Sequence, residues 1–142
     1  MIKLYISVTN DIITDQRVNK IALSLSKLRV EIVIIGRKID EKVKIDAKSY
    51  KQKLFRLVFN KGPLFYAEYN IRLFFFLLFK KVDILVANDL DTLPANYLVS
   101  GIRKKKLVYD SHEYFTEVPE LVGRNFVKKV WTKIEKSILP RI

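Results

Sequence analysis

Three short polar segments hold the residues whose types and spacing could do chemistry. The first, Asp110-Ser111-His112-Glu113, places a hydroxyl, an imidazole and two carboxylates in consecutive positions. His112 is the chain's single histidine, and imidazole is the side chain whose ordinary pKa lies closest to neutrality. Neighbouring residues of an extended segment point alternately, so Asp110, Ser111 and His112 cannot form a nucleophilic triad unaided. His112 therefore has two alternative roles: it contacts a ligand, or its role is purely structural.

The second segment, Asn88-Asp89-Leu90-Asp91-Thr92, contains two carboxylates spaced two residues apart. Such a pair could ligate a metal ion or accept hydrogen bonds from the hydroxyl groups of a polyol. The competing interpretation is a polar turn in which Asp91 caps the helix that follows. Because the turn needs only one cap, Asp89 is the better candidate for contact with a ligand.

The third segment runs from Thr9 to Arg17 and contains no glycine. The glycine-rich dinucleotide fingerprint and the phosphate-cradling P-loop are therefore both missing here, which disfavours a dehydrogenase or a P-loop NTPase. Asn10 and Asp11 are interpreted either as turn formers or as ligand contacts. Asp15 is expected to cap the following helix.

The order of the predicted elements explains why these segments belong together. Apolar runs predict strands at 2–8, 30–36, 54–59, 82–89 and 106–110, and helical spacing of apolar residues predicts helices at 16–29, 64–81, from Asp91 to about Gly101, and 125–139. Strand–helix–strand units with short links imply parallel pairing. The fold class predicted is α/β, a Rossmann-like doubly wound parallel sheet, in which ligands bind beyond the carboxyl ends of the strands. All three polar segments follow such ends.

Composition narrows the classes of function. The chain has 142 residues, enough for one domain, and a formal net charge of +12, which favours anionic partners. It contains no cysteine, which excludes disulfides, thiolate zinc sites and cysteine nucleophiles. A single histidine excludes metal sites built from several histidines. The N-terminus carries no recognisable signal peptide, and the apolar run Leu73–Phe79 is too short to cross a bilayer.

The helix predicted at 64–81 is unusually aromatic. Phe74, Phe75 and Phe76 fan over about 200° of a helical wheel, so they cannot all face one sheet. Exposed rings beside basic side chains are typical of an interfacial membrane patch, which is predicted to comprise Arg72, Phe75, Phe76, Lys80 and Lys81. The alternative is a helix covered on two sides by a further domain. The basic run 103–106 lacks a recognised nucleic-acid-binding module, so nucleic acid is not an expected partner.

Two of these motifs, ANDLDTLPA and YDSHEYFTEVPEL, together with the later W…IEKSILPR, resemble the N-terminal half of bacterial family-4 glycosyltransferases, which have the GT-B fold. The first predicted strand–helix–strand unit fits the same half, so the resemblance covers nearly the whole chain. It implies that residues 1–142 form the acceptor-side Rossmann-like domain, incomplete at its C-terminal end, with the donor-binding domain absent. Because the donor-binding domain is absent, residues 1–142 alone are expected to have no transferase activity.

The resemblance also implies a reaction. A hexosyl group would pass from a nucleotide-sugar to a lipid-linked or polysaccharide acceptor, with retention, without a metal and without a cofactor. His112 would be the catalytic residue near the donor sugar, while Asn10, Asp11, Asp89 and Glu113 would contact donor or acceptor. Family members commonly have glycines after the first strand, and this chain does not.

Partners and location follow from the same resemblance and from the charge. The expected partners are the nucleotide-sugar, held mainly by the second domain, the acceptor, and an anionic membrane surface. The expected location is the cytoplasm, with peripheral contact at the inner face of the cytoplasmic membrane. The alternative function is a non-catalytic protein-binding module derived from a truncated transferase, which would bind through an unfinished sheet edge and the aromatic helix.

Overall fold

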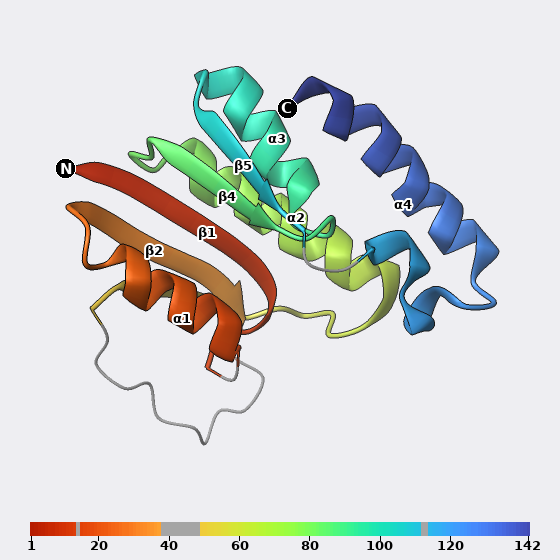
Figure 1. Cartoon of the computed structure of the whole chain (residues 1–142). Helices are drawn as coiled ribbons and strands as arrows, with labels where there is room; N and C mark the ends of the chain where they lie inside the picture. Colours follow the sequence, from red (N-terminus) through yellow and green to blue (C-terminus); the bar gives the residue numbers. More distant parts are fainter. Residues whose placement is uncertain (14, 38–48, 112–113) are drawn as a thin grey trace.

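The computed structural model describes residues 1–13, 15–37, 49–111 and 114–142 (Figure 1). The predicted site residues His112 and Glu113 lie outside the described residues. In chain order the elements are β1 (Ile2–Asp11), α1 (Gln16–Leu25), β2 (Val30–Arg37), β3 (Lys51–Phe55), α2 (Gly62–Leu78), β4 (Ile84–Asn88), α3 (Leu93–Arg103), β5 (Lys106–Asp110), the 3-10 turns η1 (Phe115–Glu117) and η2 (Pro119–Leu121), α4 (Asn125–Ile138), and η3 (Leu139–Arg141).

The five described strands form one parallel sheet in the order β3-β2-β1-β4-β5. Helix α1 covers one face, and α2 and α3 cover the other (Figure 1). The chain therefore winds first to one side of β1 and then to the other, which confirms the predicted Rossmann-like doubly wound fold. The strand order reverses between β1 and β4.

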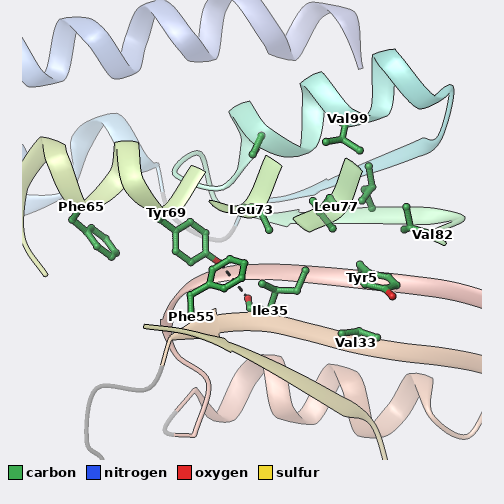
Figure 2. Close-up of a cluster of buried hydrophobic side chains, with 12 residues drawn as sticks. Tyr5, Val33, Ile35, Phe55, Phe65, Tyr69, Leu73, Leu77, Val82 and Val99 are labelled. Carbon is green, nitrogen blue, oxygen red and sulfur yellow. Dashed lines mark hydrogen bonds between the residues drawn. The ribbon is translucent and has the colours of Figure 1, made fainter. Parts of the chain in front are cut away.

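The pleat of the strands divides the core into two layers. Successive side chains of a strand point to opposite faces, so Leu4 and Ile6 of β1 pack toward α1, whereas Tyr5 packs toward α2. Helix α2 meets the sheet through residues spaced one turn apart, Phe65, Tyr69, Leu73 and Leu77, all of which are buried (Figure 2). This spacing explains how an almost wholly apolar helix still has a defined inner side.

Several predicted boundaries were wrong, among them those of β3, α1 and α2. The third strand is Lys51–Phe55 rather than 54–59: it is an edge strand whose charged start pairs with β2, and Lys51 forms an ion pair with Glu31 at 2.7 Å. Polar residues on an edge strand are easily taken for a loop. Helix α1 stops at Leu25, and α2 begins at Gly62 because Pro63 suits a first helical turn.

Helix α4 packs beside α3 at the far end of the sheet (Figure 1). Trp131 anchors it, with ring centroids 5.2 Å from both Tyr66 of α2 and Phe115 of η1. The side of α4 that carries Trp131 and Ile138 is buried, as its helical spacing predicted. The helix thus forms a wall next to the carboxyl ends of the strands.

Candidate functional site

A cleft of about 750 Å³ opens at the carboxyl edge of the sheet. It lies where β1 and β4 lead the chain in opposite directions, the position at which doubly wound sheets bind ligands. Thr9 and Asn10 from β1 line it together with Asn88, Asp89 and Asp91 from the turn after β4. Two of the three polar segments predicted to meet at this edge thus line one cleft.

Asp91 lies at the floor of this cleft, only 6% exposed. Its Oδ2 accepts a hydrogen bond from the Thr9 hydroxyl, and its Oδ1 is buried with no hydrogen-bond partner among the described residues. Burial raises the pKa of Asp91 to about 7; the Thr9 hydrogen bond opposes the rise, and the charge of Asp89 adds to it. The floor therefore holds a carboxyl group that changes protonation near neutral pH.

The interpretation of Asp91 as a helix cap was wrong. Thr92 is the residue at the cap position of α3, and Asp91 directs its carboxyl to β1 instead. The Thr92 hydroxyl donates to the carbonyl of Asn88 at 2.9 Å. By contrast, Asp15 does cap α1, because its side chain accepts from the amide of Val18 at 3.1 Å.

Asp89 sits in a turn that places it in the cleft. Its φ is +62°, a left-handed conformation that aspartate tolerates better than most residues. Its amide donates to the carbonyl of Asp110 at 3.0 Å, which ties this turn to the end of β5. Asp89 is half-buried and lines the cleft, so it stands where the sequence placed a ligand contact.

Asn10 and Asp11 separate in the structure. Asn10 is exposed and lines the cleft, whereas Asp11 is buried, accepts from the amide of Ile13 at 3.0 Å, and is not among the described residues that line the cleft. Gly36 of β2 allows this end of β1 to lie close to it. A Cβ at position 36 would come within 2.9 Å of Val8 Cγ2 and 3.2 Å of the Asn10 carbonyl.

Asn70 braces the floor from the opposite layer, a role that the sequence analysis missed. Its Nδ2 donates to the Asp91 carbonyl at 2.7 Å, and its Oδ1 accepts from the amide of Ala95 at 3.2 Å. The hydroxyl of buried Tyr69 likewise donates to the carbonyls of Val8 and Ile35 (Figure 2). An asparagine within a mostly apolar helix was the signal that could have revealed this brace.

The opposite wall of the cleft is apolar and aromatic. It consists of residues from η1, η2 and α4: Phe115, Val118, Leu121, Phe126, Val127, Val130, Trp131 and Ile134. Phe126 is 79% exposed, whereas Trp131 is only 7% exposed. The sequence predicted the amphipathic character of α4 but not that its apolar side lines a cleft, because periodicity does not distinguish a buried face from a ligand-facing one.

Basic side chains also line the cleft: Arg37 and Lys61 form one corner, where Arg37 bonds to the residue before Lys61, and Arg124 lies before α4. The Arg37 guanidinium lies 4.3 Å from the centroid of the Phe65 ring, and its Nη1 donates to the carbonyl of Asn60 at 3.3 Å. The cleft thus presents three chemistries: acidic and amide groups, an apolar wall, and a basic corner.

The predicted membrane patch lies outside the cleft, on the C-terminal half of α2 and the residues after it. Phe75 is 54% exposed, and Lys80 and Lys81 are exposed. Arg72 forms an ion pair with Glu68 at 2.8 Å.

Phe76 of the same set points inward. It is half-buried, with ring centroids 6.3 Å from Tyr5 and 5.9 Å from Phe55. Lys80 Nζ lies 5.4 Å from the Phe76 centroid. Of the two phenylalanines in the predicted patch, Phe75 is therefore the exposed one.

Two searches of the described residues bear on other kinds of site. Those residues contain no group of three or more histidine, cysteine, aspartate or glutamate side chains that could hold a metal ion. Across the same described ranges, no helix is both long and apolar enough to cross a membrane.

Comparison with known proteins supports the fold class and does not bear on the function. No protein-family model matches the chain, and no curated protein matches it. Among solved structures it is similar to the C-terminal domain of the hydrogenase PF1911 from Pyrococcus furiosus, with a TM-score of 0.56 and 13% sequence identity over 76% of this chain and 89% of that one. At this identity the likeness shows the α/β fold alone.

Proposed function

We propose that this chain is the acceptor-side domain of a glycosyltransferase that moves a hexosyl group from a nucleotide-sugar to a lipid-linked or polysaccharide acceptor. The make-up of the cleft supports the proposal best. Asn10, Asp89 and Asn88 line it on one side, and Phe115 and Trp131 on the other. Amides and carboxylates exchange hydrogen bonds with hydroxyl groups, and aromatic rings offer an apolar face to the C–H groups of a sugar ring.

The sequence resemblance supports the same reaction. It assigns the nucleotide part of the donor to a second Rossmann-like domain, and retention and independence from a metal are proposed on its basis alone. In this proposal Asp89 and Asn10 bind hydroxyls of the acceptor, and His112 acts at the transferred sugar. Strand β5 ends at Asp110, at the carboxyl edge of the sheet.

The transferase proposal is tested in the protein as its own gene produces it. Membranes from cells making the protein are incubated with radiolabelled uridine- and guanosine-diphosphate hexoses, and label is counted in lipid-extractable and polymeric products. We expect His112→Ala to lower incorporation about a hundredfold or more, and Asp89→Asn to raise the KM for the acceptor. Asp83→Asn, at the opposite end of β4, is the matched control. Wild-type incorporation that both variants preserve would contradict the proposal.

Contact with an anionic membrane is the second part of the proposal. The exposed Phe75 and the exposed Lys80 and Lys81, which follow it in the sequence, support a surface that dips one ring below the lipid headgroups while the lysines meet anionic lipid. This surface and the cleft lie on different parts of α2, the cleft at its start and the patch toward its end. One helix would thereby connect membrane attachment to acceptor binding.

A protein-binding module is a second candidate, because one part of the sheet is uncovered. Strand β5 is at the edge of the described sheet, and Val108, on it, is 48% exposed. A groove of about 300 Å³ next to it is lined by Ile21, Val86 and Val108 among others. Edge strands with apolar surface are sites of strand addition. Under this candidate Val108→Lys would abolish partner capture, and sugars would have no effect on the chain.

A further inference from the structure

Arg37 holds a fixed position at the basic corner of the cleft. It is the last residue of β2 and is half-buried. Two contacts orient the guanidinium plane. Arg37 Cζ lies 4.3 Å from the centroid of the Phe65 ring, and Nη1 donates a hydrogen bond to the Asn60 carbonyl at 3.3 Å. A guanidinium held on an aromatic face keeps its remaining N–H groups directed along that plane.

The charge of Arg37 is not neutralised within the described residues. Arg72 and Arg17 form ion pairs with Glu68 and Asp110, whereas no carboxylate in the described ranges pairs with Arg37. Its Nε is buried and has no hydrogen-bond partner in the part of the chain that the structure describes. An unpaired buried donor on a charged group carries a desolvation cost, and such exceptions in folded proteins call for an explanation.

Neighbouring groups make the same corner positive. Lys61 is exposed and lines the cleft directly beside Asn60, and Arg124 lines it as well. Helix α2 begins at Gly62 without a side-chain cap and without an acidic residue in its first turn, which adds the partial positive charge of a helix start to the two side chains. The corner thus combines a planar donor with further positive charge.

The acidic groups of the cleft belong to other elements. Asp89 and Asp91 follow β4, and Asp15 is engaged as the cap of α1. A ligand that satisfies both regions needs hydroxyl groups for the acidic side and an anion for the basic corner. Phosphate fits the corner best, because guanidinium forms paired, charge-assisted hydrogen bonds with phosphate oxygens.

We infer that Arg37, supported by Lys61, forms a phosphate-binding subsite, so that the sugar ligand of this cleft carries a phosphate ester. The identity of the ligand as a sugar rests on the proposed function, whereas the subsite itself rests on the Arg37 geometry. Two sources share this chemistry: a sugar phosphate and the diphosphate of a nucleotide. Both would place phosphate oxygens against the Nη groups of Arg37, which lines the cleft.

The test is a titration of the 142-residue chain, labelled with ¹⁵N, with inorganic pyrophosphate, glucose 1-phosphate and uridine diphosphate at constant ionic strength. We expect saturable shifts of the Arg37 Nε–H signal and of the Gly62 and Leu64 amides. Arg37→Gln should weaken binding at least about tenfold. Arg56→Gln, which removes an exposed arginine outside the cleft, should leave binding unchanged.

The outcomes separate the possibilities. Tighter binding of glucose 1-phosphate than of uridine diphosphate assigns the subsite to a sugar phosphate, and the reverse order assigns it to a nucleotide; either supports the inference if Arg37→Gln removes it. An Arg37→Lys variant serves as a control for misfolding, because it keeps the positive charge and loses only the planar arrangement of guanidinium N–H donors. Equal effects of Arg37→Gln and Arg56→Gln, or no saturable shift with any of the three anions, would overturn it. Sugar transfer takes no part in this readout, so the inference can fail while the transferase proposal stands, and the reverse.

Discussion

Asp91 should make the protein less stable as the pH rises through neutrality. Its carboxyl has an ordinary pKa of 3.8 in the unfolded chain and about 7 in the folded one, because burial disfavours the charged form. The folded state therefore holds a proton that the unfolded state has released between these two values. In that window the free energy of unfolding falls with increasing pH, and above about pH 7 the loss is complete and constant.

The magnitude follows from the displacement of the pKa. One pKa unit corresponds to about 1.4 kcal/mol, so the full displacement from 3.8 to about 7 costs about 4 kcal/mol. About 3 kcal/mol of this cost arises between about pH 5 and about pH 8. Asp91→Asn removes the titration but keeps an oxygen that can accept from the Thr9 hydroxyl. Relative to wild type, the variant should gain about 3 kcal/mol between these two pH values.

Denaturant unfolding at the two pH values measures this directly, with Trp131, the chain's single tryptophan and a buried one, as the fluorescent probe. Taking the difference between variant and wild type cancels the titration of every other group. Asp83→Asn is the control: its pKa is lowered, first by the hydrogen bond from the Lys3 amide, so its contribution is lost only on acidification below that window. If the Asp91→Asn difference stays constant within about 0.5 kcal/mol, the reasoning is refuted.

Three further predictions follow from the packing and the surface. Trp131→Ala should lower the free energy of unfolding by about 3–5 kcal/mol, because it empties the junction of α4 with α2 and η1; thermal melting by circular dichroism checks this, and a loss below about 1 kcal/mol would contradict it. Tyr69→Phe should cost about 1–3 kcal/mol in chemical denaturation, since two buried carbonyls lose their donor, and an unchanged midpoint would count against that account. Phe75→Ser should weaken co-sedimentation with anionic vesicles without changing the melting temperature, whereas Phe76→Ser should lower the melting temperature; the opposite pattern would place the membrane surface elsewhere.

The fold was predictable because its signals are local and strong. Two apolar β-branched runs joined by an amphipathic helix predicted the β1–α1–β2 unit, and Asp15 marked the start of that helix correctly. The start of the edge strand β3 was missed because its first three residues are Lys51, Gln52 and Lys53. A strand with one unpaired side needs little apolar sequence, so periodicity does not detect it.

The site was predictable only in part. That Asn10 and Asp89 line one cleft was predictable, because polar residues at strand ends meet at the carboxyl edge of a parallel sheet; their contact with a ligand stays a prediction. The bond of Asp91 to Thr9 was not predicted, because whether a carboxylate caps a helix or crosses to a neighbouring strand depends on tertiary packing, and the contact of Asn70 with the Asp91 carbonyl depends on the same packing. The aromatic wall was missed for a related reason: a residue such as Phe126, 79% exposed beside a cleft, has the same sequence pattern as one in a core.

Asp91 also connects stability to the site. A cost of about 4 kcal/mol is a large share of the stability of a domain of this size. Proteins tolerate such locally unfavourable groups mainly at functional positions. The buried carboxyl at the cleft floor is therefore a candidate functional position.

The central claim is that the cleft at the carboxyl edge binds a sugar ligand, and one titration tests it most directly. Octyl glucoside, a sugar with an apolar chain, is added below its micelle concentration while the emission of Trp131 in the cleft wall is recorded. We predict a saturable change in emission that glucose reproduces at higher concentration, that Asp89→Asn weakens, and that Asp83→Asn leaves unchanged. An emission that stays constant, or that responds equally to octyl glucoside in wild type and in Asp89→Asn, would contradict the account.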